Sequence, residues 1–197
     1  LDRLDVLGVA APGATVLLNA PCAPTEVWAQ LPREVQDEIL AKKLKVFSID
    51  AVKVAKEAGL GGRVNAVMQT CFFAISGVLP RDEAIQRIKE SIEKSYGKKG
   101  DEVVRRNFQA VDRTLENLHQ VPIPKEASAT KRRLPAVPKH APDFVQRVTA
   151  KMLANQGDLL PVSAFLPEGT WPTGTAQYEK RSIALEIPVW DEKLCIQ

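Results

Sequence analysis

A cluster of prolines divides this chain and limits every fold that it can adopt. The cluster lies between Val121 and Pro142 and holds the five prolines Pro122, Pro124, Pro135, Pro138 and Pro142, with Lys131-Arg132-Arg133 among them. Proline fixes φ and has no backbone N–H, which excludes this stretch from helices and from inner strands of a sheet. We predict an extended connector over residues 121–142 that joins two parts of different character.

The part before the connector alternates between strand and helix patterns. Short apolar and β-branched runs predict buried parallel strands at 14–19 and 45–50. Helical spacing predicts the end of a helix at 2–10 and helices at 24–31, 33–44, 52–58, 65–76, 82–96 and 101–120. This order indicates the α/β class with an open parallel sheet. Two strands leave such a sheet incomplete, so we expect further strands in sequence that precedes Leu1.

The part after the connector has one helical pattern, at 143–155, for which Gly157 is the expected cap. Residues 158–197 are rich in Pro, Gly and Thr and lack helical periodicity. They contain too little apolar sequence for an independent core. We therefore expect an extended linker that lies along other domains.

Composition excludes several classes of function. The chain has 197 residues, 45% apolar and 26% charged, which is typical of a globular protein. A net charge of +3, with acidic and basic residues interleaved, does not indicate nucleic-acid binding. No apolar run is long enough to span a membrane. The three cysteines, Cys22, Cys71 and Cys195, have no regular spacing, which argues against disulfides and favours the cytoplasm.

No catalytic constellation is visible in the sequence. His119 and His140 are expected to be exposed or packing residues, and Cys71 lies in an apolar helix as a core residue. Gly59-Leu60-Gly61-Gly62 precedes a helix, where backbone N–H groups could hold an anion. It lacks the spacing of a dinucleotide fingerprint and a strand directly before it, which favours an ordinary helix end and turn.

Two further patterns leave alternatives open. Asn65 begins an otherwise apolar helix, and an amide there is typical of an N-cap. Cys195-Ile196-Gln197 corresponds to the first three positions of a C-x-x-C unit, the spacing of metal or iron–sulfur ligands. A lone cysteine at that place is also compatible with a small apolar residue.

Several strings resemble pyruvate:ferredoxin (flavodoxin) oxidoreductases, which are large single-chain enzymes acting on 2-oxoacids. They are Gly62–Arg81, Ser95–Gly100, Val103–Phe108, Trp171–Thr175 and Ile187–Leu194. The resemblance extends from Leu1 to Gln197. It implies a gamma-type domain at 1–120 with its N-terminal part missing, the connector at 121–142, a linker domain at 143–194, and the start of a truncated ferredoxin-like 4Fe-4S domain at 195–197.

The resemblance also implies a reaction, in which pyruvate and coenzyme A give acetyl-CoA and CO2 and electrons pass to ferredoxin or flavodoxin. The cofactors of the full-length homodimer would be thiamine diphosphate, Mg²⁺ and [4Fe–4S] clusters. We expect this piece to hold none of them alone, to be inactive, and to contribute coenzyme A binding and a tether between domains. The alternative is a non-catalytic gamma-type binding or assembly subunit.

The site residues implied by the resemblance lie in two short motifs. Asn65 and Asn107 align with asparagines that contact coenzyme A, and we expect both at or near helix ends. Their neighbours Arg63 and Arg106 could add charge against phosphate. Cys195 is the implied [4Fe–4S] ligand in the full-length protein.

Overall fold

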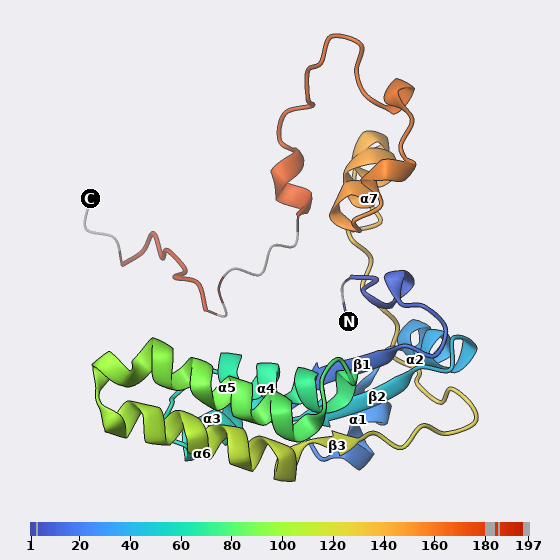
Figure 1. Cartoon of the computed structure of the whole chain (residues 1–197). Helices are drawn as coiled ribbons and strands as arrows, with labels where there is room; N and C mark the ends of the chain where they lie inside the picture. Colours follow the sequence, from blue (N-terminus) through green and yellow to red (C-terminus); the bar gives the residue numbers. More distant parts are fainter. Residues whose placement is uncertain (3, 180–183, 185, 195–197) are drawn as a thin grey trace. The chain divides into compact units, whose positions relative to one another are not determined.

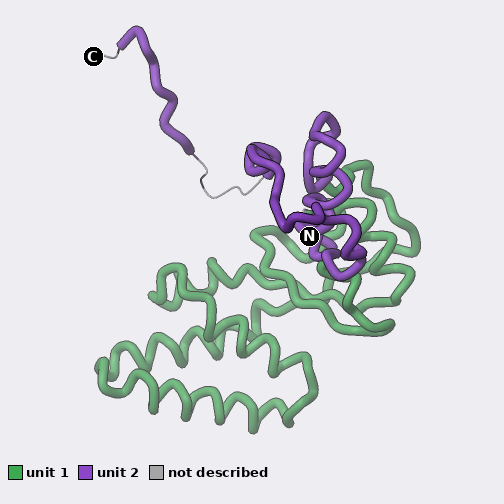
Figure 2. The backbone as a smooth tube through the Cα atoms, turned by 90° about the horizontal axis from the view of Figure 1, so that it is seen from above, with its two compact units in different colours: residues 1–2, 6–133 green, residues 3–5, 134–197 purple. Residues whose placement is uncertain are grey.

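The computed structural model describes residues 1–2, 4–179, 184 and 186–194. The chain divides into two compact units (Figure 2). Residues 1–2 and 6–133 form the α/β unit, while residues 4–5 and the described residues from 134 onward belong to the C-terminal unit. The boundary therefore falls inside the predicted connector. Residues 121–142 form neither helix nor strand, as their prolines predicted.

The α/β unit contains a short mixed sheet in the order β1-β2-β3 (Figure 1). Strands β1 (Thr15–Asn19) and β2 (Lys45–Ile49) are parallel, and β3 (His119–Gln120) pairs antiparallel with β2. Among the described residues β1 pairs with β2 alone, so the sheet is incomplete. This confirms the predicted α/β class.

The third strand corrects one sequence prediction. The last helix of the unit was expected to reach Gln120, but it ends at Asn117, and Leu118 is extended with φ −88° and ψ 116°. His119 then pairs with Ser48, and Gln120 with Phe47. The sheet offers these residues hydrogen-bond partners that a helix approaching Pro122 cannot, because proline restricts the chain before it.

Six α-helices complete the unit. They are α1 (Pro24–Gln30), α2 (Arg33–Ala41), α3 (Ala51–Glu57), α4 (Asn65–Ser76), α5 (Arg81–Tyr96) and α6 (Asp101–Asn117). Their ends follow local chemistry: the Asp50 carboxylate caps α3 by accepting the Lys53 N–H at 2.9 Å, and α4 ends at Gly77 with φ +68°. The helix expected at 2–10 is a 3₁₀ turn at Leu7–Val9.

Side chains of β1 alternate between two apolar cores, one on each face of the sheet. Val16 and Leu18 pack into the first core with α1 and α2, whereas Leu17 packs into the second core with α3, α4 and α6. Helix α5 lies beside α6 and packs on it through Ile88 and Ile92 (Figure 1). The sheet thus separates the helices into two groups.

The C-terminal unit is irregular. A π-helical turn at Val145–Thr149 leads into α7 (Ala150–Leu153), and 3₁₀ turns follow at Gly157–Leu159, Val162–Ala164 and Thr175–Tyr178. The predicted cap was wrong, because Asn155 takes the left-handed conformation with φ +57° and Gly157 opens the next turn. Val137, Ala141 and Val145 form a small buried cluster, to which the connector contributes two residues. None of these buried residues lies in 158–197, the segment for which no independent core was expected.

Candidate functional site

The loop between α3 and α4, residues 58–64, is anchored rather than free. Leu60 is 6% exposed and packs in the second core, and its N–H donates to the Ala55 carbonyl at 2.8 Å. Gly59 and Gly61 have φ of +72° and +65°, conformations that favour glycine. The glycines therefore shape a turn whose position is set by the buried leucine.

This loop lies directly against α6. A Cβ atom placed on Gly59 would be 3.2 Å from Cδ and 3.4 Å from Nε of Arg106. The glycine backbone thus fills the space beside the arginine side chain. Through this contact and the packing of α4 on α6, the loop that leads into Arg63 and Asn65 lies against the helix that carries Arg106 and Asn107.

The electrostatics of this region leave an excess of positive charge. Arg106 Nε donates to Glu102 Oε1 at 2.9 Å, and Arg105 pairs with the same carboxylate. These contacts, the Arg106 hydrogen bond first, hold the pKa of Glu102 below its usual value. Arg63 is exposed and forms no ion pair with the residues that the structure describes. Arg105 and Arg106 share the single carboxylate of Glu102, and the positive charge of Arg63 has no acidic partner in the part of the chain that the structure describes, so an anionic ligand could be accommodated.

Asn65 is exposed at the start of α4 and does not cap the helix. It is the first residue of α4 and is exposed, while the N-cap position belongs to Val64, without any side-chain capping bond. Within the described part of the chain the Asn65 amide makes no hydrogen bond. The N-cap interpretation of this residue was therefore wrong. Its amide can offer both donors and an acceptor.

Asn107 lies in a different environment. It is 6% exposed in the interior of α6, so the expectation of a position near a helix end was wrong for this residue. Its Nδ2 donates to the Val103 carbonyl at 2.8 Å, which satisfies the amide locally. A ligand would have to bind Oδ1 or displace that bond.

Comparisons with known proteins identify the family. The family model described as pyruvate ferredoxin/flavodoxin oxidoreductase matches residues 3–117. This chain belongs to that oxidoreductase family. A second model, for a domain of unknown function named EKR, matches residues 130–184.

Relatives match the chain over its full length. They include a putative pyruvate-flavodoxin oxidoreductase of Synechocystis sp. at 52% identity, a pyruvate-flavodoxin oxidoreductase of Rhodospirillum rubrum at 56%, and a pyruvate:ferredoxin oxidoreductase of Moorella thermoacetica at 46%. In each case 100% of this chain is covered, but only 16–17% of the relative. The chain therefore spans about one sixth of these oxidoreductases.

The two histidines and Cys71 have the environments expected from the sequence. His119 and His140 are exposed, and His140 makes an edge contact with Tyr178 at 6.3 Å between ring centroids. Cys71 is fully buried, and burial raises the pKa of its thiol to about 12. Cys195 lies outside the described residues.

Metal ligands do not converge in the described ranges. Among residues 1–2, 4–179, 184 and 186–194, no group of three His, Cys, Asp or Glu side chains could hold a metal ion. These residues therefore do not supply the four thiolates of an iron–sulfur cluster. Nor is any helix in this part of the chain long and apolar enough to cross a bilayer.

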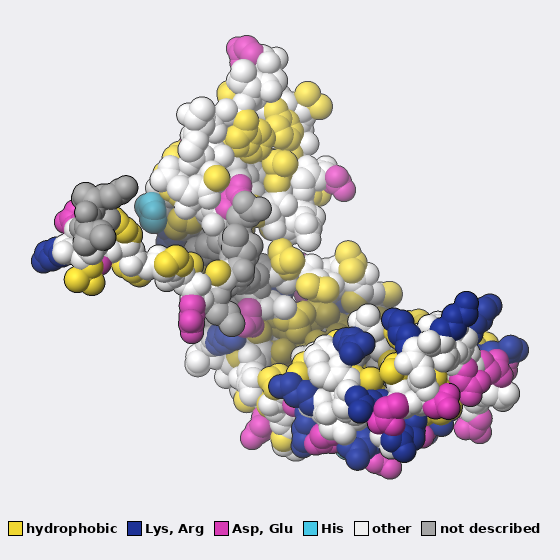
Figure 3. All heavy atoms as spheres, turned by 90° about the vertical axis from the view of Figure 1, so that its left-hand side faces the viewer, with side chains coloured by type: hydrophobic (Ala, Val, Ile, Leu, Met, Phe, Trp, Pro, Cys, Tyr) yellow, Lys and Arg dark blue, Asp and Glu magenta, His cyan; other side chains and the backbone are white. Residues whose placement is uncertain are grey.

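Charged side chains cover the α5–α6 pair in alternating signs. Figure 3 shows basic and acidic groups interleaved there, and ion pairs such as Lys89–Asp112 at 2.7 Å and Arg87–Glu83 at 3.8 Å connect them. Nucleic-acid binding requires clustered positive charge. This surface has the alternation that the sequence predicted for a solvated face.

A hollow at the carboxyl ends of β1 and β2 was not anticipated from sequence. It measures about 480 Å³ and includes Asn19, Asp50 and Lys53 in its lining. Open α/β sheets often bind ligands at this edge. Here, however, Asn19 Oδ1 accepts the Ala51 N–H at 3.0 Å and Asp50 accepts that of Lys53, so both polar side chains already serve the start of α3.

Proposed function

We propose that this chain is part of a pyruvate:ferredoxin (flavodoxin) oxidoreductase, which converts pyruvate and coenzyme A to acetyl-CoA and CO2 and passes electrons to ferredoxin or flavodoxin. Support comes from the family match and from relatives that bear this activity in their names. The thiamine diphosphate, Mg²⁺ and complete [4Fe–4S] sites would then belong to other parts of the full-length homodimer.

In this proposal, residues 1–120 are the gamma-type domain, 121–142 the connector and 143–194 a linker domain that tethers the catalytic parts. Residues 195–197 begin a ferredoxin-like domain in which Cys195 is a [4Fe–4S] ligand. The alternative, a non-catalytic gamma-type subunit, accounts less well for relatives that match the connector and everything after it in one chain.

The α3–α4 loop and α6 contribute to coenzyme A binding. The observation that carries this role is the close approach of Gly59 to Arg106, which sets the loop leading into Arg63 and Asn65 against the helix that carries Arg106 and Asn107. The arginines supply positive charge against phosphate. Asn65 supplies a side-chain amide that has no hydrogen-bond partner among the described residues. Asn107 contributes through its carbonyl oxygen, because its Nδ2 is bonded to Val103.

Replacement of Asn65 by alanine in the full-length enzyme tests this role. Loss of one neutral hydrogen bond costs about 0.5–1.5 kcal/mol, which corresponds to a rise of roughly 2- to 13-fold in KM for coenzyme A. KM for pyruvate should not change. Gln69→Ala is the matched control, since Gln69 is an exposed amide one turn further along α4. An unchanged KM for coenzyme A, or equal losses for both substrates with a lowered Tm, would refute the assignment.

A further inference from the structure

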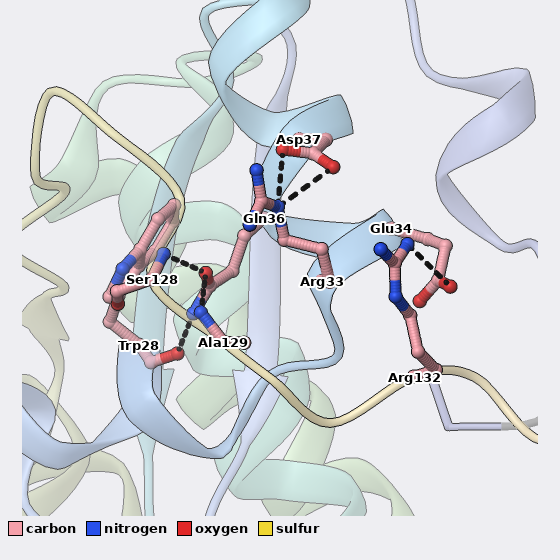
Figure 4. A network of polar contacts seen from close by, with 8 residues as sticks. All are labelled: Trp28, Arg33, Glu34, Gln36, Asp37, Ser128, Ala129 and Arg132. Carbon is pink, nitrogen blue, oxygen red and sulfur yellow. Dashed lines mark hydrogen bonds and ion pairs between the residues drawn. The ribbon is translucent and has the colours of Figure 1, made fainter.

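The first half of the connector is bound to the α/β unit through a buried glutamine. Gln36 of α2 is fully buried, and its Oε1 accepts the N–H groups of Ser128 at 2.8 Å and Ala129 at 2.9 Å (Figure 4). Its Nε2 donates to the Trp28 carbonyl at 2.6 Å. Both ends of the amide are thus used, and one side chain links α1, α2 and the connector.

Contacts on either side extend this attachment. Val121 is buried in the first core and donates to the Val46 carbonyl at 2.8 Å. Further along, the Arg33 N–H donates to the Lys131 carbonyl at 2.8 Å, and the Glu34 carboxylate accepts the Arg133 N–H at 2.9 Å. Residues 121–133 of the connector, which we call the strap, are therefore bound to the α/β unit at the beginning, in the middle and at the end of this segment.

The free part of the connector is much shorter than its sequence suggests. Beyond Arg133, the next buried residue is Val137, which belongs to the core of the C-terminal unit. Only residues 134–136 lie between the last strap bond and that core. The composition had indicated a connector of 22 residues, over 121–142.

We propose that the strap sets the length of the tether between the two units, with Gln36 holding its middle and Glu34 its end. A flexible chain spans about 5–6 Å times the square root of its length, so three residues give roughly 10 Å. If the strap were released beyond Ile123, the 13 residues 124–136 would be free and would give roughly 20 Å. The volume within reach of the connector would then grow about eightfold.

This inference rests on contacts within the α/β unit and is independent of the coenzyme A proposal. It also gives the basic triplet a structural role. Lys131 pairs with Asp2 at 2.9 Å and Arg132 with Glu34 at 3.4 Å, so the triplet closes the strap on the surface. The tether is short because these side chains and Gln36 bind successive parts of the strap to the α/β unit.

Hydrogen exchange in the full-length protein tests the strap. The amides of Ser128, Ala129 and Arg133 should be protected in the unaltered protein, although they lie in a proline-rich segment without regular structure. Gln36→Leu should raise exchange of Ser128 and Ala129 at least tenfold, because the acceptor is lost. Gln86→Leu is the control: Gln86 lies on α5, where its amide bonds to Glu90, and its loss should leave the strap unchanged.

A second variant separates strap release from unfolding. Glu34→Ala alters a surface side chain and should expose Arg133 while the amides of β2 stay protected. Spin labels on the two units should show a wider distance distribution when Gln36→Leu and Glu34→Ala are combined, because the strap then loses the side-chain acceptors of both its middle and its end. The proposal is overturned if Ser128 and Ala129 exchange without protection in the unaltered protein, or if Gln36→Leu leaves them protected. It is also overturned if Gln36→Leu removes the exchange protection of the β2 amides and Glu34→Ala leaves the exchange rate of the Arg133 amide unchanged.

Discussion

Replacing each glycine of the α3–α4 loop by alanine should separate backbone conformation from side-chain contact. Gly59 and Gly61 both have positive φ, but only Gly59 has Arg106 against the place where a Cβ would stand. Gly62 has no positive φ and has open space around it. The three positions thus form a graded series within four residues of chain.

The expected changes in loop stability are the balance of two opposing contributions to the free energy. A side chain in the left-handed region costs about 1–2 kcal/mol, whereas alanine restricts the unfolded chain and returns about 0.4–1 kcal/mol. Gly62→Ala should therefore stabilise the loop by about 0.4–1 kcal/mol, and Gly61→Ala should cost up to about 1.5 kcal/mol. Gly59→Ala should cost the most, about 1–2 kcal/mol, because Arg106 must also move a few tenths of an ångström from its place beside Glu102.

The amide of Leu60, which donates to Ala55 across this turn, is the reporter. Under conditions in which exchange reports equilibrium opening, it should exchange about 5- to 30-fold faster in Gly59→Ala and about 2- to 5-fold slower in Gly62→Ala. Equal effects at Gly59 and Gly61 would show that the Arg106 contact contributes nothing. A Gly62 variant as disruptive as Gly59→Ala would refute the conformational reasoning altogether.

Two other predictions follow from buried groups. Burial raises the pKa of Cys71 from 9.0 to about 12, so iodoacetamide at pH 8 should modify half-buried Cys22 and spare Cys71. The stability that the buried, protonated thiol contributes is present below about pH 9 and is lost as the pH rises toward 12. Thr149 is 5% exposed and its Oγ1 has no hydrogen-bond partner among the described residues, so Thr149→Val should slow exchange of the Ala154 amide by stabilising α7 about 1 kcal/mol. Thr114→Val is its control and should destabilise α6 by a similar amount, because the Thr114 hydroxyl donates to Ala110 at 2.6 Å.

Local sequence signals predicted the elements whose causes are local. The strands at 15–19 and 45–49 are short apolar runs, and the helix at 65–76 has the predicted bounds because Gly77 ends it. Prediction failed where distant residues decide. The strand at 119–120 exists because β2 offers free backbone groups, and no local pattern reveals that partner.

The candidate site shows the same division. Sequence reasoning selected Arg63, Asn65, Arg106 and Asn107 in two separate motifs, but it could not tell that Asn65 is exposed and Asn107 buried. The contact of Gly59 with Arg106 depends on how α3 and α6 pack on the sheet. Gln36 gave no signal at all, because an isolated glutamine in a helix pattern is normally a surface residue.

The sheet keeps the two proposed roles of this chain apart. Gln36 lies between Val35 and Ile39 of the first core, whereas Leu60 anchors the α3–α4 loop in the second core, on the opposite face. Side chains without shared partners contribute nearly additively to stability and binding. Loosening the strap should therefore lengthen the tether without reshaping the loop, and changes at Asn65 should alter ligand contact without freeing the connector. One small unit can thus serve both as a binding surface and as the fixed end of a tether.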